Sequence, residues 1–356
     1  MNCDYIIVGS GLASIMFAEQ LRTHQKSFVV ISDRSQQASV VASGLYNPVV
    51  LKRFTAAWNA ASHLETAIPK YASLEKLLGL KLDYEVPIHR VFNSVQEQNN
   101  WFLACDKPLL TPFLNPKLVD NKNTSIKAPF GFGEVNATGR IDTQKLIEAY
   151  SAFLTETNQY IAETFDYEDL IETPEGLSYK SIQAKHIVFT EGFGIHKNPY
   201  FKKLPLEGTK GELITIHAPQ LLLSTILKSS IFVIPMGEDQ YLVGSTYEWT
   251  DKTNTPTEGA KSQLLNKLER LVTCDFEVVD QRAGIRPTVS DRRPLVGRHP
   301  NHKQMYVLNG LGTRGVLIAP AMAEALYAFI ETDTPLPEEI DINRFSTVFF
   351  LTKDAS

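Results

Sequence analysis

The sequence predicts a mixed α/β fold in which a discontinuous domain, built on a parallel sheet, carries an inserted domain of antiparallel strands. Three observations lead to this fold class. A β-α-β pattern begins at residue 5, and a second buried strand runs into glycines at residues 184–194. A glycine-rich loop at residues 310–315 precedes an apolar helix. Clusters of short strands interrupt these elements twice, as an inserted sheet would.

Composition bounds the class of protein. The 356 residues are 43% hydrophobic and 21% charged, which is typical of a globular chain with a large core. The net charge is −5 and no basic run exceeds two residues, so we expect no nucleic-acid partner. Cys3, Cys105 and Cys274 form no C-x-x-C pair and indicate buried thiols of a reducing compartment. We see no signal peptide and no membrane span, and expect a cytoplasmic protein.

The first element is the β-α-β unit that begins with "YIIVGSGLAS". An apolar strand at residues 5–8 runs into Gly9-Ser10-Gly11, a segment of helical periodicity follows from Leu12, and a second strand lies at residues 27–32. Gly9 permits a tight turn, and Gly11 lets a phosphate approach the backbone at the helix N-terminus. Ser14 occupies the third small position. The pattern predicts dinucleotide binding, the alternative being a plain strand–helix turn.

The end of the second strand departs from the usual dinucleotide fingerprint. An acidic residue there normally binds the ribose hydroxyls. This chain has Ser32, with Asp33 one residue later. Either Ser32 makes a neutral hydrogen bond or Asp33 takes the role after a small shift, and the fingerprint does not choose between NAD and FAD.

The middle of the chain supplies the remaining elements. A small-residue stretch and a Tyr46-Asn47-Pro turn lead to the basic pair Lys52-Arg53, and residues 58–80 look helical with an interruption at Pro69. Residues 86–136 carry strand and turn signals. Asp142 is a suitable N-cap for a helix over the following residues to 154. Further strands are expected at 184–194, 211–216, 231–235 and 241–249, and an amphipathic helix at 258–272.

Near the end of the chain, "AGIRPTVSDRRPLVGRHP" and "MYVLNGLGTRGVLIAPAMAEAL" resemble the closing signature of the glycine oxidase / D-amino-acid oxidase (DAO) flavoprotein family. Other family-like pieces occur in the expected order: "ASVVASGLYNP", "GRIDTQKL", "HIVFTEGFG", "LPLEGTKGELI" and "IFVIPMGEDQYLVGST". The resemblance covers nearly the whole chain. It implies a Rossmann-type FAD-binding domain at residues 1–80, 137–204 and 283–356, and a substrate domain at residues 81–136 and 205–282.

The resemblance implies FAD as cofactor. We expect it to be non-covalent, because the cysteine that carries the flavin in some sarcosine oxidases would lie near Gly284, where this chain has none. Thr190 and Gly192 would lie beside the cofactor, with Glu191 as an unusual charge between them. The other expected cofactor-binding residues are Gly9, Ser10, Gly11, Leu12, Ala13, Ser14, Ser32, Asp33, Ala42, Ser43, Gly44, Leu170, Gly310, Gly312, Thr313, Arg314, Gly315 and Val316.

At the reacting centre, the resemblance makes Arg286 the residue that binds a substrate carboxylate. An arginine fork suits a carboxylate, and the alternative is a structural ion pair. Phe232 replaces a tyrosine of glycine oxidase, Tyr247 matches another pocket position, and Thr313 replaces a basic residue. These changes weaken glycine itself as the substrate. Lys52 and Arg53 would either lie near the flavin or form a solvated pair. The histidines show no metal-ligand spacing, so no metal is expected.

The implied function is FAD-dependent oxidation of the C–N bond of a small amine or amino acid. A hydride passes from the α-carbon to the flavin, water hydrolyses the imine, and dioxygen reoxidises the cofactor. One alternative is oxidative removal of a carboxymethyl group from a modified tRNA uridine. Another is a flavin-binding protein without amine oxidase activity. The substrate, the electron acceptor and the oligomeric state stay open.

Overall fold

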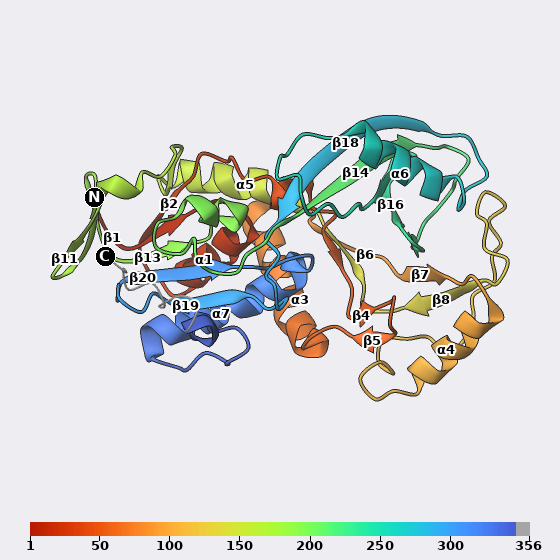
Figure 1. The fold of residues 1–356 in the computed structure, drawn as a ribbon, viewed down its shortest axis with the longest axis horizontal. Helices are drawn as coiled ribbons and strands as arrows, with labels where there is room; N and C mark the ends of the chain where they lie inside the picture. The colour runs from red at the N-terminus through yellow and green to blue at the C-terminus, as the bar shows by residue number, and fades with distance from the viewer. Residues whose placement is uncertain (347–356) are drawn as a thin grey trace.

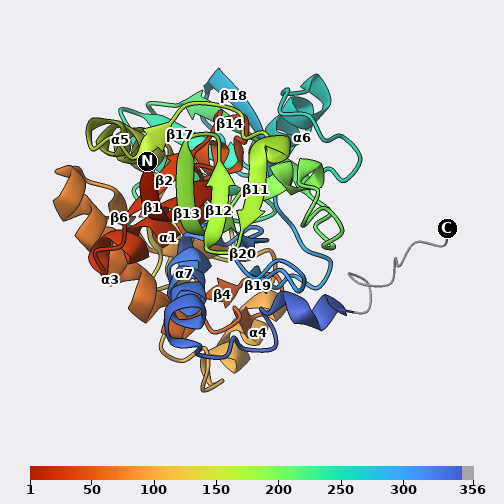
Figure 2. The ribbon, with the colours of Figure 1, turned by 90° about the vertical axis from the view of Figure 1, so that its left-hand side faces the viewer.

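A parallel sheet forms the centre of one half of the molecule (Figure 1). The computed structural model describes residues 1–346. Five strands lie parallel in the order β10-β2-β1-β13-β20, and β19 pairs antiparallel with β20. A hairpin of β11 and β12 pairs with the first residues of β13, next to β20 (Figure 2). The bounds are β1 Asn2–Val8, β2 Phe28–Ile31, β10 Tyr160–Ile161, β11 Leu170–Thr173, β12 Gly176–Tyr179, β13 Ile182–Phe189, β19 Leu295–Arg298 and β20 Met305–Asn309.

Both faces of this sheet are buried, as a continuous run of apolar residues requires. Tyr5 and Ile7 of β1 pack into a core shared with the helices, whereas Ile6 and Val8 pack into a second core with the β11–β12 hairpin. The helices of the first core are α1 (Leu12–Thr23), α3 (Ala60–Leu78), α5 (Thr143–Glu156) and α7 (Gly315–Thr332). The predicted β-α-β unit is therefore present, with β1 and β2 parallel.

A second sheet forms the other half of the molecule, in the strand order β18-β14-β17-β16-β15-β7-β8. Its strands come from two separate segments of the chain. Neighbours are antiparallel except for β7 and β15, which join the two segments in parallel. The exact domain boundaries stay a prediction, and β18 runs across the one at residue 283. The bounds are β7 Ile88–Val91, β8 Phe132–Val135, β14 Thr209–His217, β15 Ile226–Lys228, β16 Phe232–Gly237, β17 Gln240–Gly244 and β18 Glu277–Arg286.

Shorter elements link the two halves or cover them. The helix expected at 258–272 is present as α6 (Glu258–Leu268), which packs on the second sheet. A small sheet has the order β3-β9-β6, and β4 pairs with β5. The other bounds are β3 Leu45–Tyr46, β4 Val49–Val50, β5 Thr55–Ala56, β6 Asp83–Glu85, β9 Gly139–Ile141, α2 Ala38–Val41, α4 Val95–Cys105, η1 Tyr167–Asp169, η2 Gly192–Lys197 and η3 Ile342–Phe345.

Three sequence-based expectations need correction. Helix α3 is not interrupted at Pro69 but runs through it, because buried residues on both sides, Leu64 and Tyr71, pack into one core. The strand expected at 241–249 ends at Gly244. Helix α4 went unnoticed among the strand signals of 86–136, although Ser94 caps it by accepting a hydrogen bond from the Glu97 amide. The S-x-x-E spacing is a capping-box signal that could have revealed it.

Helix α7 is the one helix within residues 1–346 that is long and apolar enough to cross a membrane by length and composition alone. It packs against α1 and α3 in the first core. A buried core helix of a globular protein can have the same length and apolar composition.

Candidate cofactor and substrate site

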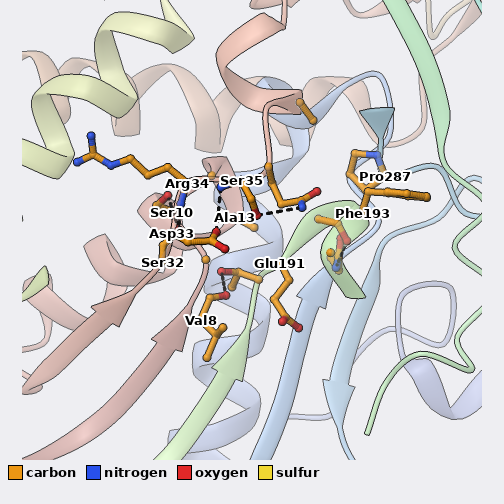
Figure 3. A pocket seen from close by; sticks show the side chains of 18 of the residues that line it. Val8, Ser10, Ala13, Ser32, Asp33, Arg34, Ser35, Glu191, Phe193 and Pro287 are labelled. Atoms are coloured by element: carbon orange, nitrogen blue, oxygen red, sulfur yellow. Dashed lines mark hydrogen bonds between the residues drawn. The ribbon is translucent and has the colours of Figure 1, made fainter. Parts of the chain in front are cut away.

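A cavity opens at the carboxyl ends of β1, β2 and β13, the edge at which open α/β sheets bind ligands (Figure 3). It encloses about 980 Å³, part of it open to solvent. One end is lined by Ser32, Asp33 and Arg34, and the other by Phe193 and Pro287. Predicted cofactor residues that line it are Gly9, Ser10, Gly11, Leu12, Ala13, Ser32, Asp33, Thr190 and Gly192.

The Gly9-Ser10-Gly11 turn lines the cavity and packs closely against its neighbours. Gly9 has φ +113°, and a Cβ there would lie 2.8 Å from the Thr190 carbonyl oxygen. Thr190 is itself fixed, because its amide and its hydroxyl each donate a 2.8 Å hydrogen bond to the Val8 carbonyl. Gly11 is the N-cap of α1 and provides no side-chain capping bond. The Leu12 amide donates a 3.2 Å hydrogen bond to the Ser39 hydroxyl. The next first-turn N–H groups of α1 have no intrahelical acceptor, which favours an anion there.

The structure places both candidate ribose ligands in the cavity wall. The Ser32 hydroxyl lies 2.9 Å from the Ser10 hydroxyl and accepts a hydrogen bond from the Arg34 amide. The Asp33 carboxylate accepts hydrogen bonds from the Ser35 amide and the Thr164 hydroxyl. Burial opposes its ionisation, but these bonds outweigh it and lower the pKa of Asp33. Ser32 and Asp33 both stay predicted ribose ligands.

Glu191 is a buried acid in the cavity wall. Burial raises its pKa to about 7, although hydrogen bonds from Asn198 and Tyr167 partly offset that effect. The Asn198 amide donates at 2.8 Å, and the Tyr167 phenol donates to the other carboxylate oxygen. The sequence marked Glu191 as unusual but gave no signal for these two partners, which come from separate elements.

The other predicted cofactor residues lie outside the cavity wall, and their roles stay predictions. They are Ser14, Ala42, Ser43, Gly44, Leu170, Gly310, Gly312, Thr313, Arg314, Gly315 and Val316. At Gly44 a structural reason for glycine is sufficient, because a Cβ would lie 1.8 Å from the Ile141 carbonyl oxygen. The Gly310–Gly315 loop borders the cavity through Leu311, and the Gly312 amide donates a 3.0 Å hydrogen bond to the Pro287 carbonyl.

Arg286 ends β18 and lies in the same region, immediately before Pro287. Its guanidinium donates a 3.3 Å hydrogen bond to the Thr246 carbonyl and lies 4.7 Å from the centre of the Tyr247 ring. Gly211 of β14 makes room for it, since a Cβ there would lie 1.9 Å from Arg286 Nη2. No carboxylate within residues 1–346 pairs with Arg286, and burial lowers its pKa.

Tyr247 is 60% exposed and lies past the end of β17. Two buried charged residues of β14 bind the loop that follows Tyr247. Lys210 donates hydrogen bonds to Asp251 and to the Thr255 carbonyl, while Glu212 accepts from the Thr257 amide and hydroxyl. Sequence reasoning missed this anchor, although charged residues at alternate strand positions were a signal for it.

The structure therefore brings Arg286 and Tyr247 together, and the role of Phe232 stays a prediction. Phe232 lies in β16, with β14 and β17 between it and β18. Its buried ring packs beside Gly244, where a Cβ would lie 3.1 Å from Phe232 Cζ. Lys52 and Arg53 are exposed in the turn between β4 and β5, as a solvated pair would be. Within residues 1–346, no three His, Cys, Asp or Glu side chains are grouped to hold a metal ion.

Sequence comparison relates the chain to one enzyme family over almost its whole length. The family model described as FAD dependent oxidoreductase (DAO) matches residues 4–328. Glycine oxidase of Bacillus subtilis (strain 168) is 24% identical over 216 residues, 55% of this chain and 57% of that enzyme. The tRNA 5-methylaminomethyl-2-thiouridine biosynthesis bifunctional protein MnmC of Azoarcus sp. is 25% identical over 181 residues, 45% of this chain and 28% of that protein. Each match spans less than two thirds of the relative's length.

Solved structures share the fold. Glycine oxidase from Geobacillus kaustophilus has a TM-score of 0.74 at 18% identity, and the match covers 100% of both chains. Iminodiacetate oxidase (IdaA) from Chelativorans sp. BNC1 has a TM-score of 0.75 at 16% identity, covering 94% of this chain and 97% of that one. L-amino acid deaminase from Proteus vulgaris has a TM-score of 0.77 at 13% identity, covering 97% of each chain. The predicted fold class is confirmed.

Proposed function

We propose, from the premise that this chain belongs to the DAO family of FAD-dependent oxidoreductases, that it oxidises the C–N bond of a small amine carrying a carboxylate. The family fixes the cofactor as FAD and the class of enzyme as oxidoreductase. The donor group, the substrate and the final electron acceptor are the parts that we propose.

The nucleotide cavity fits FAD. Gly9 and Gly11 line the cavity, and a Cβ at either would meet a neighbour, the Thr190 carbonyl at Gly9 and the Ser39 hydroxyl at Gly11. Gly11 does not cap α1 with a side chain, so the first turn of the helix offers N–H groups to a pyrophosphate. Ser32 or Asp33 would bind the ribose at one end. Cys3, Cys105 and Cys274 do not line the cavity, which supports non-covalent binding. When bound, FAD supplies the acceptor for a hydride from the substrate α-carbon.

The observation that carries the proposal is the unpaired guanidinium of Arg286. A partly buried cation without a carboxylate partner is unfavourable, and an anionic ligand would supply that partner. A substrate carboxylate can occupy two donors of the arginine fork at once, which fixes its orientation. The ring of Tyr247 stacks on the guanidinium and restricts its motion. Together these residues would hold the α-carbon of the amine in one position.

No described side chain is assigned as a strong base, and the proposed reaction needs none. A neutral amine can release a hydride from its α-carbon when it is correctly oriented, so the protein contributes positioning and charge. Water would then hydrolyse the imine product. Dioxygen is the proposed final acceptor of the electrons.

The test is flavin bleaching under anaerobic conditions by a panel of amines with and without a carboxylate. Bleaching by sarcosine or another carboxylate-bearing amine supports the proposal. Bleaching only by a tRNA that carries a carboxymethylamino uridine would favour the tRNA-modifying alternative, which the MnmC match raises. Bleaching by none would leave a flavin-binding protein without amine oxidase activity.

A further inference from the structure

A second arginine without an ion-pair partner in residues 1–346 lies at the start of α7, in the loop next to Pro287. Arg314 is the N-cap residue of α7 and is partly buried. Its hydrogen bonds in residues 1–346 are made by its backbone, and its guanidinium forms no ion pair there. The charges that act on it are the Tyr247 phenol and the Arg292 guanidinium, and burial lowers its pKa.

Arg286 and Arg314 share Tyr247 as a neighbour. The Arg286 guanidinium lies over the Tyr247 ring at 4.7 Å, and the charge of Arg314 interacts with the phenol of the same residue. Their backbones are also joined. Pro287, which follows Arg286, accepts a 3.0 Å hydrogen bond from the amide of Gly312, two residues before Arg314. The residue after Arg286 is therefore in direct contact with the loop before Arg314, and both arginines interact with Tyr247.

Each of the two arginines is a partly desolvated cation, and no ion pair within residues 1–346 neutralises either of them. A ligand with one carboxylate would neutralise one of them. A ligand with two would neutralise both, and each fork could form charge-assisted hydrogen bonds to its own carboxylate. Removing either arginine would then leave a carboxylate without its partner, which is costly in a partly buried site.

We infer that the substrate is an amine bearing two carboxylates, one bound by Arg286 and the other by Arg314. The class includes N-carboxymethyl amino acids and amino dicarboxylates. This inference rests on the proposed function and names its substrate class. Arg314 is thereby a specificity residue for the substrate and not a ligand of the cofactor.

The first test compares sarcosine with iminodiacetate, which differ by one carboxylate on the same secondary amine. The holoenzyme is mixed anaerobically with each, and the rate of flavin reduction is measured at subsaturating concentration. At equal concentration, we expect iminodiacetate to reduce the flavin at least tenfold faster than sarcosine does. In Arg314→Leu the rate with iminodiacetate should fall at least tenfold, and the rate with sarcosine should change by less than threefold. Equal losses for both substrates would overturn the inference.

Arg292→Leu is the matched control, since Arg292 is an exposed arginine near Arg314. It removes the same charge, and both rates should stay within twofold of the wild-type values. A loss in this variant as large as that in Arg314→Leu would mean that only the overall positive field matters. Flavin content is measured in every variant. Loss of FAD from Arg314→Leu would make Arg314 a cofactor ligand and contradict the inference.

A binding measurement separates the inference from the proposed function. The flavin absorption spectrum is titrated with the unreactive dianions malonate, succinate and glutarate, and with acetate. If at least one dianion binds at least tenfold tighter than acetate, and this preference disappears in Arg314→Leu, the double-anion site stands even where no amine bleaches the flavin. Equal binding of acetate and all three dianions would contradict the site, even where sarcosine does bleach it.

Discussion

The phenol of Tyr71 donates a 2.8 Å hydrogen bond to the backbone carbonyl of Val316. Val316 lies in the first turn of α7, four residues before Pro320. Proline has no N–H, so this carbonyl lacks its normal intrahelical donor. Tyr71 is fully buried in α3, and its hydroxyl takes the place of the missing amide. The bond therefore fixes the start of α7, next to Arg314.

Tyr71→Phe should destabilise the protein because it leaves the buried Val316 carbonyl without a donor. The expected loss in free energy of unfolding is about 1–3 kcal/mol, measured by urea denaturation. In a Pro320→Ala background the new amide at residue 320 can donate to Val316, so Tyr71→Phe should cost much less. Equal costs in both backgrounds would show that the hydroxyl does not substitute for the missing amide.

Gly11→Val should abolish FAD binding while the chain still folds. Gly11 has an ordinary φ of −84°, so a side chain does not strain the backbone. Its Cβ would lie 3.1 Å from the Ser39 hydroxyl, and the branched side chain would crowd the first turn of α1. The flavin content of the purified variant checks this. Gly259→Val is the control, since Gly259 is exposed in α6 and a Cβ there meets nothing within 4 Å. Full FAD occupancy in Gly11→Val would show that the FAD phosphates do not bind at this turn.

Gly211→Ala should impair substrate oxidation without loss of flavin. The new methyl group would occupy the position of the Arg286 guanidinium, 1.9 Å from Nη2, and displace it. The rate of anaerobic flavin reduction by sarcosine should fall by roughly a hundredfold or more, as for the loss of a charged partner. In an Arg286→Leu background, Gly211→Ala should cause almost no further loss in the rate of flavin reduction. An additive loss would mean that Gly211 acts independently of the arginine.

The stability of the apoprotein should depend on pH through Glu191. The folded carboxyl has a pKa of about 7, against 4.5 for an unperturbed glutamate. Because the folded state holds the proton more tightly, the stabilisation is complete below pH 4.5 and is lost as pH rises to 7. The loss is of order 3 kcal/mol at about 1.4 kcal/mol per pH unit.

Urea denaturation across this pH range checks the effect, with Glu191→Gln as the comparison. The variant cannot ionise, so its free energy of unfolding should lack this decline. Parallel pH profiles for the two proteins would show that Glu191 does not titrate with a raised pKa in the fold.

Much of the fold could be predicted because local sequence patterns specify many of its helices and strands. The apolar run before Gly9 and the N-cap at Asp142 specify their elements without tertiary information, and Asp142 does accept from the Lys145 amide. The prediction of an interruption at Pro69 was wrong because it considered only the local cost of a proline within a helix. The buried residues on both sides of Pro69 stabilise α3 across it. The parallel pairing of β7 with β15 was out of reach, since it joins segments more than a hundred residues apart.

The site could be predicted only in part, for the same reason. Arg286 and the Gly9–Gly11 turn belong to contiguous motifs that the sequence shows directly. The neighbourhood of Arg286, Tyr247 and Arg314 depends on how β18, α7 and the loop after β17 meet in space. Likewise the partners of Glu191 come from η1 and from the end of η2, and no spacing in the sequence links them.

The central claim is that Arg286 binds the carboxylate of an amine whose C–N bond is oxidised. The measurement that tests it most directly is the rate of anaerobic flavin reduction by sarcosine and by dimethylamine, in the wild type and in Arg286→Leu. Leaving a partly buried carboxylate unpaired costs about 3–5 kcal/mol, so the sarcosine rate should fall by roughly two to four decades. The dimethylamine rate should change little. An equal loss for both amines, with FAD retained, would contradict the account.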